Sequence, residues 1–186
     1  VGFSMGGALA VAGGALDSSI TADGLLLIAP ALSLSRRSKM LYAVTWLHHL
    51  NLGLPSVAKP RFRAHRFVSF DIYRGLLDAI YELECRELPT WETKIPALVV
   101  LSDDDTLVSS AGVRDWIALH HLSNWELLDV PAPSAEYGHM ILDEDSLGNS
   151  NWKVLNERVE KFLARVARPP MVPAFAHLER RSALES

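Results

Sequence analysis

The residues best suited to chemistry lie at the start of the chain, where Gly2, Ser4 and Gly6 form a G-x-S-x-G box. Such a box is typical of a tight turn from a strand into a helix, which accepts only small residues beside the serine and presents its hydroxyl at the end of the strand. The alternative is an ordinary surface turn, because Gly and Ser are common there. In the first interpretation, Ser4 is a nucleophile.

A serine nucleophile needs a base and an acid elsewhere in the chain. A histidine usually takes the hydroxyl proton, and a carboxylate orients the histidine and stabilises its cation. Asp105 follows an apolar run at 97–101, and His139 comes after a second run at 125–130. If both runs are parallel strands, the three side chains meet at the carboxyl ends of the sheet, where open α/β sheets bind ligands.

Each candidate has a structural alternative. Asp103 and Asp104 compete with Asp105, because a run of acids is also typical of a solvated turn or of the N-terminus of a helix. His139 could be a structural loop residue. The other histidines have neither an identifiable carboxylate partner nor metal-ligand spacing. They are His48, His49, His65, His120, His121 and His177.

Apolar runs predict the elements that position these residues. Residues 5–16 (M-G-G-A-L-A-V-A-G-G-A-L) are small and apolar almost throughout, which indicates a helix buried on most sides. The short apolar runs at 24–30 and 95–101 are typical of strands buried on both faces of a parallel sheet. The remaining predicted core elements are a strand at 125–130 and helices at 111–122 and 151–166.

This alternation of strands and helices predicts an α/β fold with a parallel sheet flanked by helices. We expect its core to comprise residues 1–30 and 95–167, with a loosely held tail at 168–186. The sequence holds only about three whole strands and the stub of a fourth, which would leave an apolar strand edge unpaired. We therefore expect the sequence to be N-terminally truncated.

Residues 31–94 show helical spacing rather than the short apolar runs of the flanking segments, and they are expected to form a helical insertion. Helical spacing predicts helices at 38–50 and 70–88, with a loop at 51–60 between them. Met40 lies on the expected apolar face of the first helix. The expected apolar face of the second comprises Ile72, Leu76, Leu77, Ile80, Tyr81 and Leu83. Cys85 is the only cysteine, which excludes an internal disulfide and a cysteine-cluster metal site. We expect it to be a buried or half-buried structural thiol.

Composition excludes several functions. Of the 186 residues, 49% are hydrophobic and 22% charged, as in an ordinary globular domain, and the net charge of −4 gives no general case for nucleic-acid binding. No apolar run approaches the roughly 20 residues that cross a membrane. No signal peptide is visible, although a truncated sequence could not show one. The compartment stays open, with the cytoplasm or the membrane periphery favoured.

Three motifs together resemble the α/β-hydrolase fold, and within it the serine hydrolases typified by monoacylglycerol lipase and lysophospholipase. The motifs are G-F-S-M-G-G at 2–7, P-A-L-V-V-L-S-D-D-D at 96–105 and Gly138-His139. In that family the second motif is a strand, a glycine, two variable residues, the catalytic Asp and a hydrophobic pair. Ser102 stands where the glycine is usual, which places Asp105 in the catalytic position. The resemblance covers most of residues 1–166, but only the second half of the family's fold.

The resemblance implies hydrolysis of carboxylic esters through an acyl-enzyme. Ser4 would attack the ester, His139 would transfer protons and Asp105 would orient His139. The implied substrate is a small ester or lipid, such as a monoacylglycerol or lysophospholipid, and neither a metal nor an organic cofactor is implied. Amide or C–C bond cleavage on the same residues stays open, as does a non-catalytic binding module, since fold does not fix function. The oligomeric state stays unknown.

The resemblance also implies an oxyanion hole with two donors. The backbone N–H of Met5, the residue after the nucleophile, would be one donor, and the other would come from a loop that precedes residue 1. Loss of one donor typically costs about 10²–10³ in rate. We therefore expect residues 1–186 alone to be inactive or unfolded.

The insertion at 31–94 lies where the family carries a cap over its active site. Its basic and aromatic cluster at 59–67 could contact anionic lipid headgroups, which would place the cap at the membrane periphery, or it could be a solvated loop. The apolar residues of the insertion could line an acyl pocket or simply pack the cap onto the core. These are Met40, Leu41, Tyr42, Trp46, Leu47, Leu50, Leu52 and Leu54.

Overall fold

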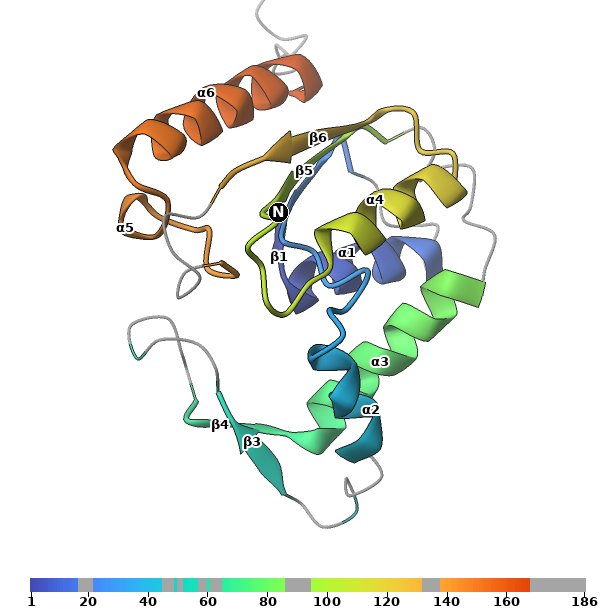
Figure 1. The fold of residues 1–186 in the computed structure, drawn as a ribbon. Coiled ribbons are helices and arrows are strands. Elements are labelled where there is room, and N and C mark those ends of the chain that lie inside the picture. The colour runs from blue at the N-terminus through green and yellow to red at the C-terminus, as the bar shows by residue number, and fades with distance from the viewer. Residues whose placement is uncertain are drawn as a thin grey trace, which may run out of the picture.

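The computed structural model describes residues 1–16, 22–44, 49, 52–56, 60, 65–85, 95–131 and 138–167. These residues form a parallel sheet with helices on both of its faces (Figure 1). The predicted α/β class is therefore confirmed. The strands, in their order across the sheet, are β1 (Gly2–Phe3), β2 (Leu25–Ile28), β5 (Ala97–Leu101) and β6 (Trp125–Asp129).

The two central strands are apolar at every position because helices cover both faces of the sheet. Leu27 and Val99 point to one face, where α1 (Met5–Leu16), α3 (Phe70–Cys85) and α4 (Ser110–Leu119) contribute to the same core. Leu26 and Leu98 point to the other face, toward α5 (Glu144–Leu147) and α6 (Asn149–Val166). The alternation along each strand thus builds two cores from one sheet.

The predicted core elements agree with the structure to within a few residues. Helix α1 has the predicted bounds, and its Ala8 and Val11 are fully buried. Small side chains on α1 permit its close approach to the sheet. Helix α4 begins at its N-cap Ser109, whose hydroxyl accepts a hydrogen bond from the Gly112 N–H at 3.1 Å.

The insertion contains strands as well as helices. It begins with a 3₁₀ turn, η1 (Ser38–Met40), and helix α2 (Leu41–Val44), whereas most of the remainder of the helix predicted at 38–50 lies outside the described residues. The loop predicted at 51–60 instead contributes β3 (Gly53–Pro55), which pairs antiparallel with β4 (Phe67–Ser69). This loop prediction was wrong because G-L-P carries no period-two pattern. The pairing depends on Gly53, where a Cβ atom would lie 2.5 Å from the Val68 carbonyl oxygen.

Helix α3 belongs to the core packing as much as to the insertion. Its buried residues Leu76, Leu77, Ile80 and Leu83 lie in one cluster with those of α1, as the apolar pattern predicts. The domain boundary at residue 94 stays a prediction, and the tail at 168–186 lies outside the described residues.

Some predicted burials were wrong. Met40, Ile72 and Tyr81 were placed on apolar helix faces, but they are 73%, 46% and 62% exposed. Nothing in the described structure covers the outer side of η1, and the buried stripe of α3 follows Leu76 and Ile80 rather than Tyr81. Cys85 was expected to be at least half buried, yet it is exposed, since it lies one helical turn after Tyr81 on the same open face.

Candidate active site

Ser4 lies in a strained turn between β1 and α1. Its φ of 50° falls in the left-handed region, which residues with a side chain rarely adopt and which recurs at functional sites. Hydrogen bonds with the end of β2, with the segment after it and with α1 hold this conformation. The Ser4 N–H donates to the Ile28 carbonyl at 2.9 Å, and the Ser4 carbonyl accepts from the N–H of Ala31 at 2.9 Å and of Gly7 at 3.0 Å. The strain is therefore held by surrounding backbone.

Two glycines make this turn possible, and only one of them belongs to the box. A Cβ atom at Gly2 would lie 2.7 Å from the Cα of Gly7, and one at Gly7 would lie 2.8 Å from the Pro30 Cβ. By contrast, a Cβ atom at Gly6 would meet nothing within 4 Å. The close packing thus requires Gly2 and Gly7, whereas the second glycine of the G-x-S-x-G pattern is not sterically required.

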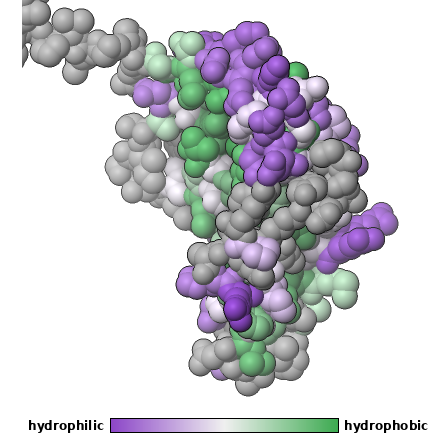
Figure 2. Space-filling model, turned by 90° about the vertical axis from the view of Figure 1, so that its left-hand side faces the viewer, coloured by the Kyte–Doolittle hydropathy of each residue, from purple (hydrophilic) through white to green (hydrophobic). Residues whose placement is uncertain are grey.

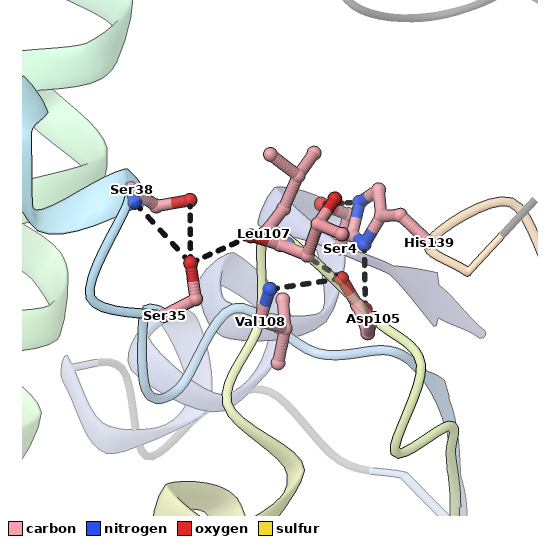
Figure 3. A network of polar contacts seen from close by, with 8 residues as sticks. Ser4, Ser35, Ser38, Asp105, Leu107, Val108 and His139 are labelled. Carbon is pink, nitrogen blue, oxygen red and sulfur yellow. Dashed lines mark hydrogen bonds and ion pairs between the residues drawn. The ribbon is translucent and has the colours of Figure 1, made fainter. Parts of the chain in front are cut away.

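The predicted residues Ser4, His139 and Asp105 come together in one chain of hydrogen bonds (Figure 3). His139 Nε2 lies 2.8 Å from Ser4 Oγ, and His139 Nδ1 lies 2.8 Å from Asp105 Oδ2. The side chains of Asp105 and His139 are only 2% and 11% exposed. Because a carboxylate can only accept, Nδ1 carries the hydrogen, and Nε2 is left to accept from the Ser4 hydroxyl.

The three competing acids differ in their contacts. Asp105 Oδ1 accepts from the N–H groups of Leu107 and Val108 at 2.8 and 3.0 Å, while its other oxygen faces His139. Asp103 turns outward to Ser110 and Arg114. The hydrogen bond from Ser110, assisted by the charge of Arg114, holds the pKa of Asp103 below its usual value. Asp104 is exposed, so of the three acids only Asp105 faces the histidine.

Gly138 allows the histidine to reach the acid. A Cβ atom at this position would lie 2.0 Å from the carbonyl oxygen of Asp104, so the histidine segment crosses the acidic turn at backbone contact. On its other side the ring of His139 lies over Phe3, with 5.1 Å between ring centroids. Together these contacts define the position of the imidazole.

The Met5 N–H lies in the first turn of α1 beside Ser4. No acceptor for it is found in the part of the chain that the structure describes. A free N–H at the N-terminus of a helix is well suited to binding negative charge. The second donor, expected from before residue 1, stays a prediction.

A pocket of about 650 Å³ opens over Ser4 and His139. Its walls are mostly apolar and come from both the core and the insertion. Of the predicted cap residues, Leu41 and Leu54 line the pocket, whereas Tyr42 and Leu52 are 48% and 51% exposed. Trp46, Leu47 and Leu50 lie outside the described residues. The other insertion residues in the wall include Val68, Ile72 and Leu76.

Sequence reasoning missed a contact that supports the acidic turn. The Ser35 hydroxyl donates to the Thr106 carbonyl at 2.6 Å (Figure 3). The Ser35 N–H donates to the Leu107 carbonyl at 2.9 Å. Ser35 accepts in turn from the N–H of Ser38 at 3.2 Å. The only available signal was the polar run at 35–39, a few residues after β2.

Two other features bear on cofactors and partners. Within the described ranges, no three His, Cys, Asp or Glu side chains gather as a metal site requires, and no helix is long and apolar enough to cross a membrane. Much of the basic and aromatic cluster at 59–67 lies outside these ranges. Of its described members, Arg66 and Phe67 are exposed.

Comparison with known proteins adds the class of fold. No protein-family model matches the chain, and no curated protein is detectably similar to it in sequence. Among solved structures, a soluble variant of monoglyceride lipase from Saccharomyces cerevisiae superposes with a TM-score of 0.67 at 15% identity, covering 90% of this chain and 62% of that chain. The monoacylglycerol lipase of Paleococcus ferrophilus superposes with a TM-score of 0.66 at 15% identity, covering 89% of this chain and 67% of that chain.

The chain therefore has the α/β-hydrolase fold, as its motifs predicted. Within that fold it is similar to the monoglyceride lipases, and it spans 62% of the length of the yeast protein.

Proposed function

We propose that this chain carries the catalytic residues of a serine hydrolase that cleaves carboxylic esters. The observation that supports it most strongly is the hydrogen-bonded chain from Ser4 through His139 to Asp105. Each residue faces the next through the atom that the chemistry requires, and the serine lies at the floor of an apolar pocket. The fold is compatible with this function, since solved lipases share it.

The proposed reaction proceeds in two halves. Ser4 Oγ attacks the ester carbonyl carbon while His139 Nε2 takes the hydroxyl proton, and the oxyanion that forms faces the Met5 N–H. The bond to the alcohol oxygen then breaks, and His139 returns the proton to that oxygen. Water attacks the acyl group on Ser4, with His139 again as the base, and releases the carboxylic acid and the free serine.

The pocket supports an apolar acyl group as the substrate portion next to Ser4. Its walls include Leu41, Leu54, Leu107 and Met140. Each additional CH₂ that enters such a pocket contributes up to about 0.8 kcal/mol, which is about fourfold in kcat/KM. We expect kcat/KM for p-nitrophenyl esters to rise with chain length and then level off. Equal rates from acetate to decanoate would contradict a lipase-like pocket.

The decisive experiment is covalent labelling by a fluorophosphonate probe of the protein at its natural full length. We expect the label on Ser4, its loss in Ser4→Ala and its retention in Ser123→Ala, which removes an exposed turn hydroxyl. A protein that folds but is not labelled would be a binding module rather than an enzyme. A labelled protein that cleaves an anilide faster than the matching ester would instead be an amidase.

Exposed apolar residues of the insertion support contact with a lipid surface. Leu52 and Phe67 are 51% and 64% exposed at the ends of the β3–β4 pair. Figure 2 shows apolar surface at the lower end of the molecule. The β3–β4 pair lies at the same height in Figure 1, since the two views differ by a turn about the vertical axis. We expect Phe67→Ser to weaken sedimentation with phosphatidylcholine vesicles, whereas Tyr81→Ser, which removes an exposed aromatic side chain of α3, should not. Equal effects would contradict a specific lipid contact.

A further inference from the structure

The pocket over Ser4 has one fixed charge in its described wall. That charge is the guanidinium of Arg37, and no Asp or Glu side chain accompanies it. Arg37 directly precedes η1 and is exposed, so it lies where the pocket meets solvent. An arginine carries its charge at any pH that proteins experience. The mostly apolar cavity therefore has a permanent cation at its mouth.

This cation has no partner among the described residues. No ion pair or side-chain hydrogen bond involves the Arg37 guanidinium, whereas Arg114 pairs with Asp103 and Asp129, and Arg165 pairs with Glu126. Arg36, the preceding residue, is also exposed but does not line the pocket. No described residue therefore competes with a molecule in the pocket for the donors of Arg37.

We propose that Arg37 binds an anionic group of the substrate, so that the site prefers apolar esters that carry a phosphate or a carboxylate over neutral esters of the same chain length. The inference rests on the proposed ester hydrolase function and selects among its substrates. A guanidinium matches the geometry of both anions with two parallel hydrogen bonds.

Two other features agree with an anion at this position. Tyr73 also lines the pocket, and burial raises the pKa of its phenol, so the hydroxyl stays protonated and can donate a hydrogen bond. The chain as a whole carries a net charge of −4, so Arg37 is a local positive charge on a chain that is negative overall. The pocket mouth therefore differs in sign from the chain as a whole, as we expect of a site that binds an anion.

The first test compares matched esters on the full-length protein. One pair is 1-oleoylglycerol 3-phosphate and 1-oleoylglycerol, which places the anion on the alcohol. The other is the p-nitrophenyl half-ester of a dicarboxylic acid and its methyl-terminated analogue, which places it on the acyl chain. We expect Arg37→Gln to lower kcat/KM for the anionic member of one pair by about tenfold or more, as for a hydrogen bond to a charged group. The neutral members should be unaffected.

Matched variants separate a specific contact from a general field. Arg36→Gln removes the same charge one residue away and should leave all four rates unchanged, whereas Arg37→Lys should restore part of the preference. Equal losses in Arg36→Gln and Arg37→Gln would overturn the assignment to Arg37. So would a loss in Arg37→Gln that is the same for neutral and anionic esters.

A binding measurement keeps the inference testable without turnover. By calorimetry, full-length Ser4→Ala should bind octyl phosphate or octanoate at least about tenfold more tightly than octanol, and the added Arg37→Gln change should abolish the difference. Equal affinities for the three ligands would refute the anion site. If anions bind in this way but no ester is cleaved and no probe labels Ser4, the proposed function fails while the anion site stands.

Discussion

The turn that carries Ser4 and the turn that carries Asp105 are held by different physical means. The Ser4 turn is fixed by close backbone packing, since Gly2 and Gly7 leave no room for a Cβ atom and Ser4 itself is strained at a φ of 50°. The Asp105 turn is fixed by hydrogen bonds from the N–H groups of Leu107 and Val108. The Ser4 turn thus adds excluded volume within the turn itself to its backbone hydrogen bonds. The Asp105 turn holds its acid by side-chain hydrogen bonds and is closely packed where Gly138 crosses it.

This difference predicts different responses to mutation. A packed turn should fail abruptly when a single carbon is added, because backbone atoms cannot rotate away from it. A hydrogen-bonded turn should lose stability in proportion to the contact removed, because each bond contributes only about 1 kcal/mol. Substitutions that keep the side-chain volume but change its polarity test the hydrogen-bonded turn. Substitutions that add volume without changing polarity test the packed turn.

The largest effect is expected from Asp105→Asn. The change keeps the volume but replaces the acceptor that orients His139, and in a well-studied serine protease the corresponding change lowers kcat by about 10⁴. Fluorophosphonate labelling and ester turnover should fall together while the melting temperature changes little. Asp104→Asn is the matched control and should be silent, since Asp104 is exposed. The reverse result would move the acid role to Asp104.

Gly7→Ala should have the next largest effect. The added carbon would lie 2.8 Å from the Pro30 Cβ, so α1 must move away from the end of β2. We expect a loss of stability of about 1–3 kcal/mol, measured by denaturant unfolding, and a loss of Ser4 labelling. Gly6→Ala adds the same carbon one residue earlier, where it meets nothing within 4 Å but lies in the pocket wall, so the unfolding free energy should stay unchanged. Similar losses in both variants would show that the turn is not held by packing.

The sequence predicted the residue types of the site better than the contacts that support them. The G-x-S-x-G box, the acidic turn and Gly138-His139 were visible because each marks a backbone feature that only a few residue types can form. The pattern nevertheless pointed to Gly6 as the second small residue, whereas packing requires Gly7. Which glycine faces Pro30 depends on how two turns far apart in sequence meet.

The fold was predictable where helices cover both faces of a strand, and less so at the surface. Residues 95–101 are apolar throughout, which identified β5 without ambiguity. The strand pair β3–β4 and the exposed faces around Met40 and Cys85 were missed, because they depend on which neighbours cover a short segment. Ser35 was missed for the same reason: a serine carries no sign of a partner 71 residues away.

Ser35→Ala tests the polar turn at a distance from the reacting atoms. It removes the hydrogen bond to the Thr106 carbonyl but no contact to His139, so it should lower kcat by a factor of about three to ten, with KM unchanged. Ser35→Thr keeps the hydroxyl and should restore most of the rate. A loss in both variants, or a rise in KM alone, would indicate a packing role instead.

The smallest effect is expected where neither packing nor polar contact is at stake. Gly75 lies inside α3, and a Cβ atom there would meet nothing within 4 Å. Because glycine destabilises a helix interior relative to alanine, Gly75→Ala should raise the unfolding free energy by about 0.5–1 kcal/mol without changing turnover. The same Gly→Ala change would thus destabilise at Gly7, be neutral at Gly6 and stabilise at Gly75. That order, measured by denaturant unfolding, isolates excluded volume as the property that distinguishes the Ser4 turn.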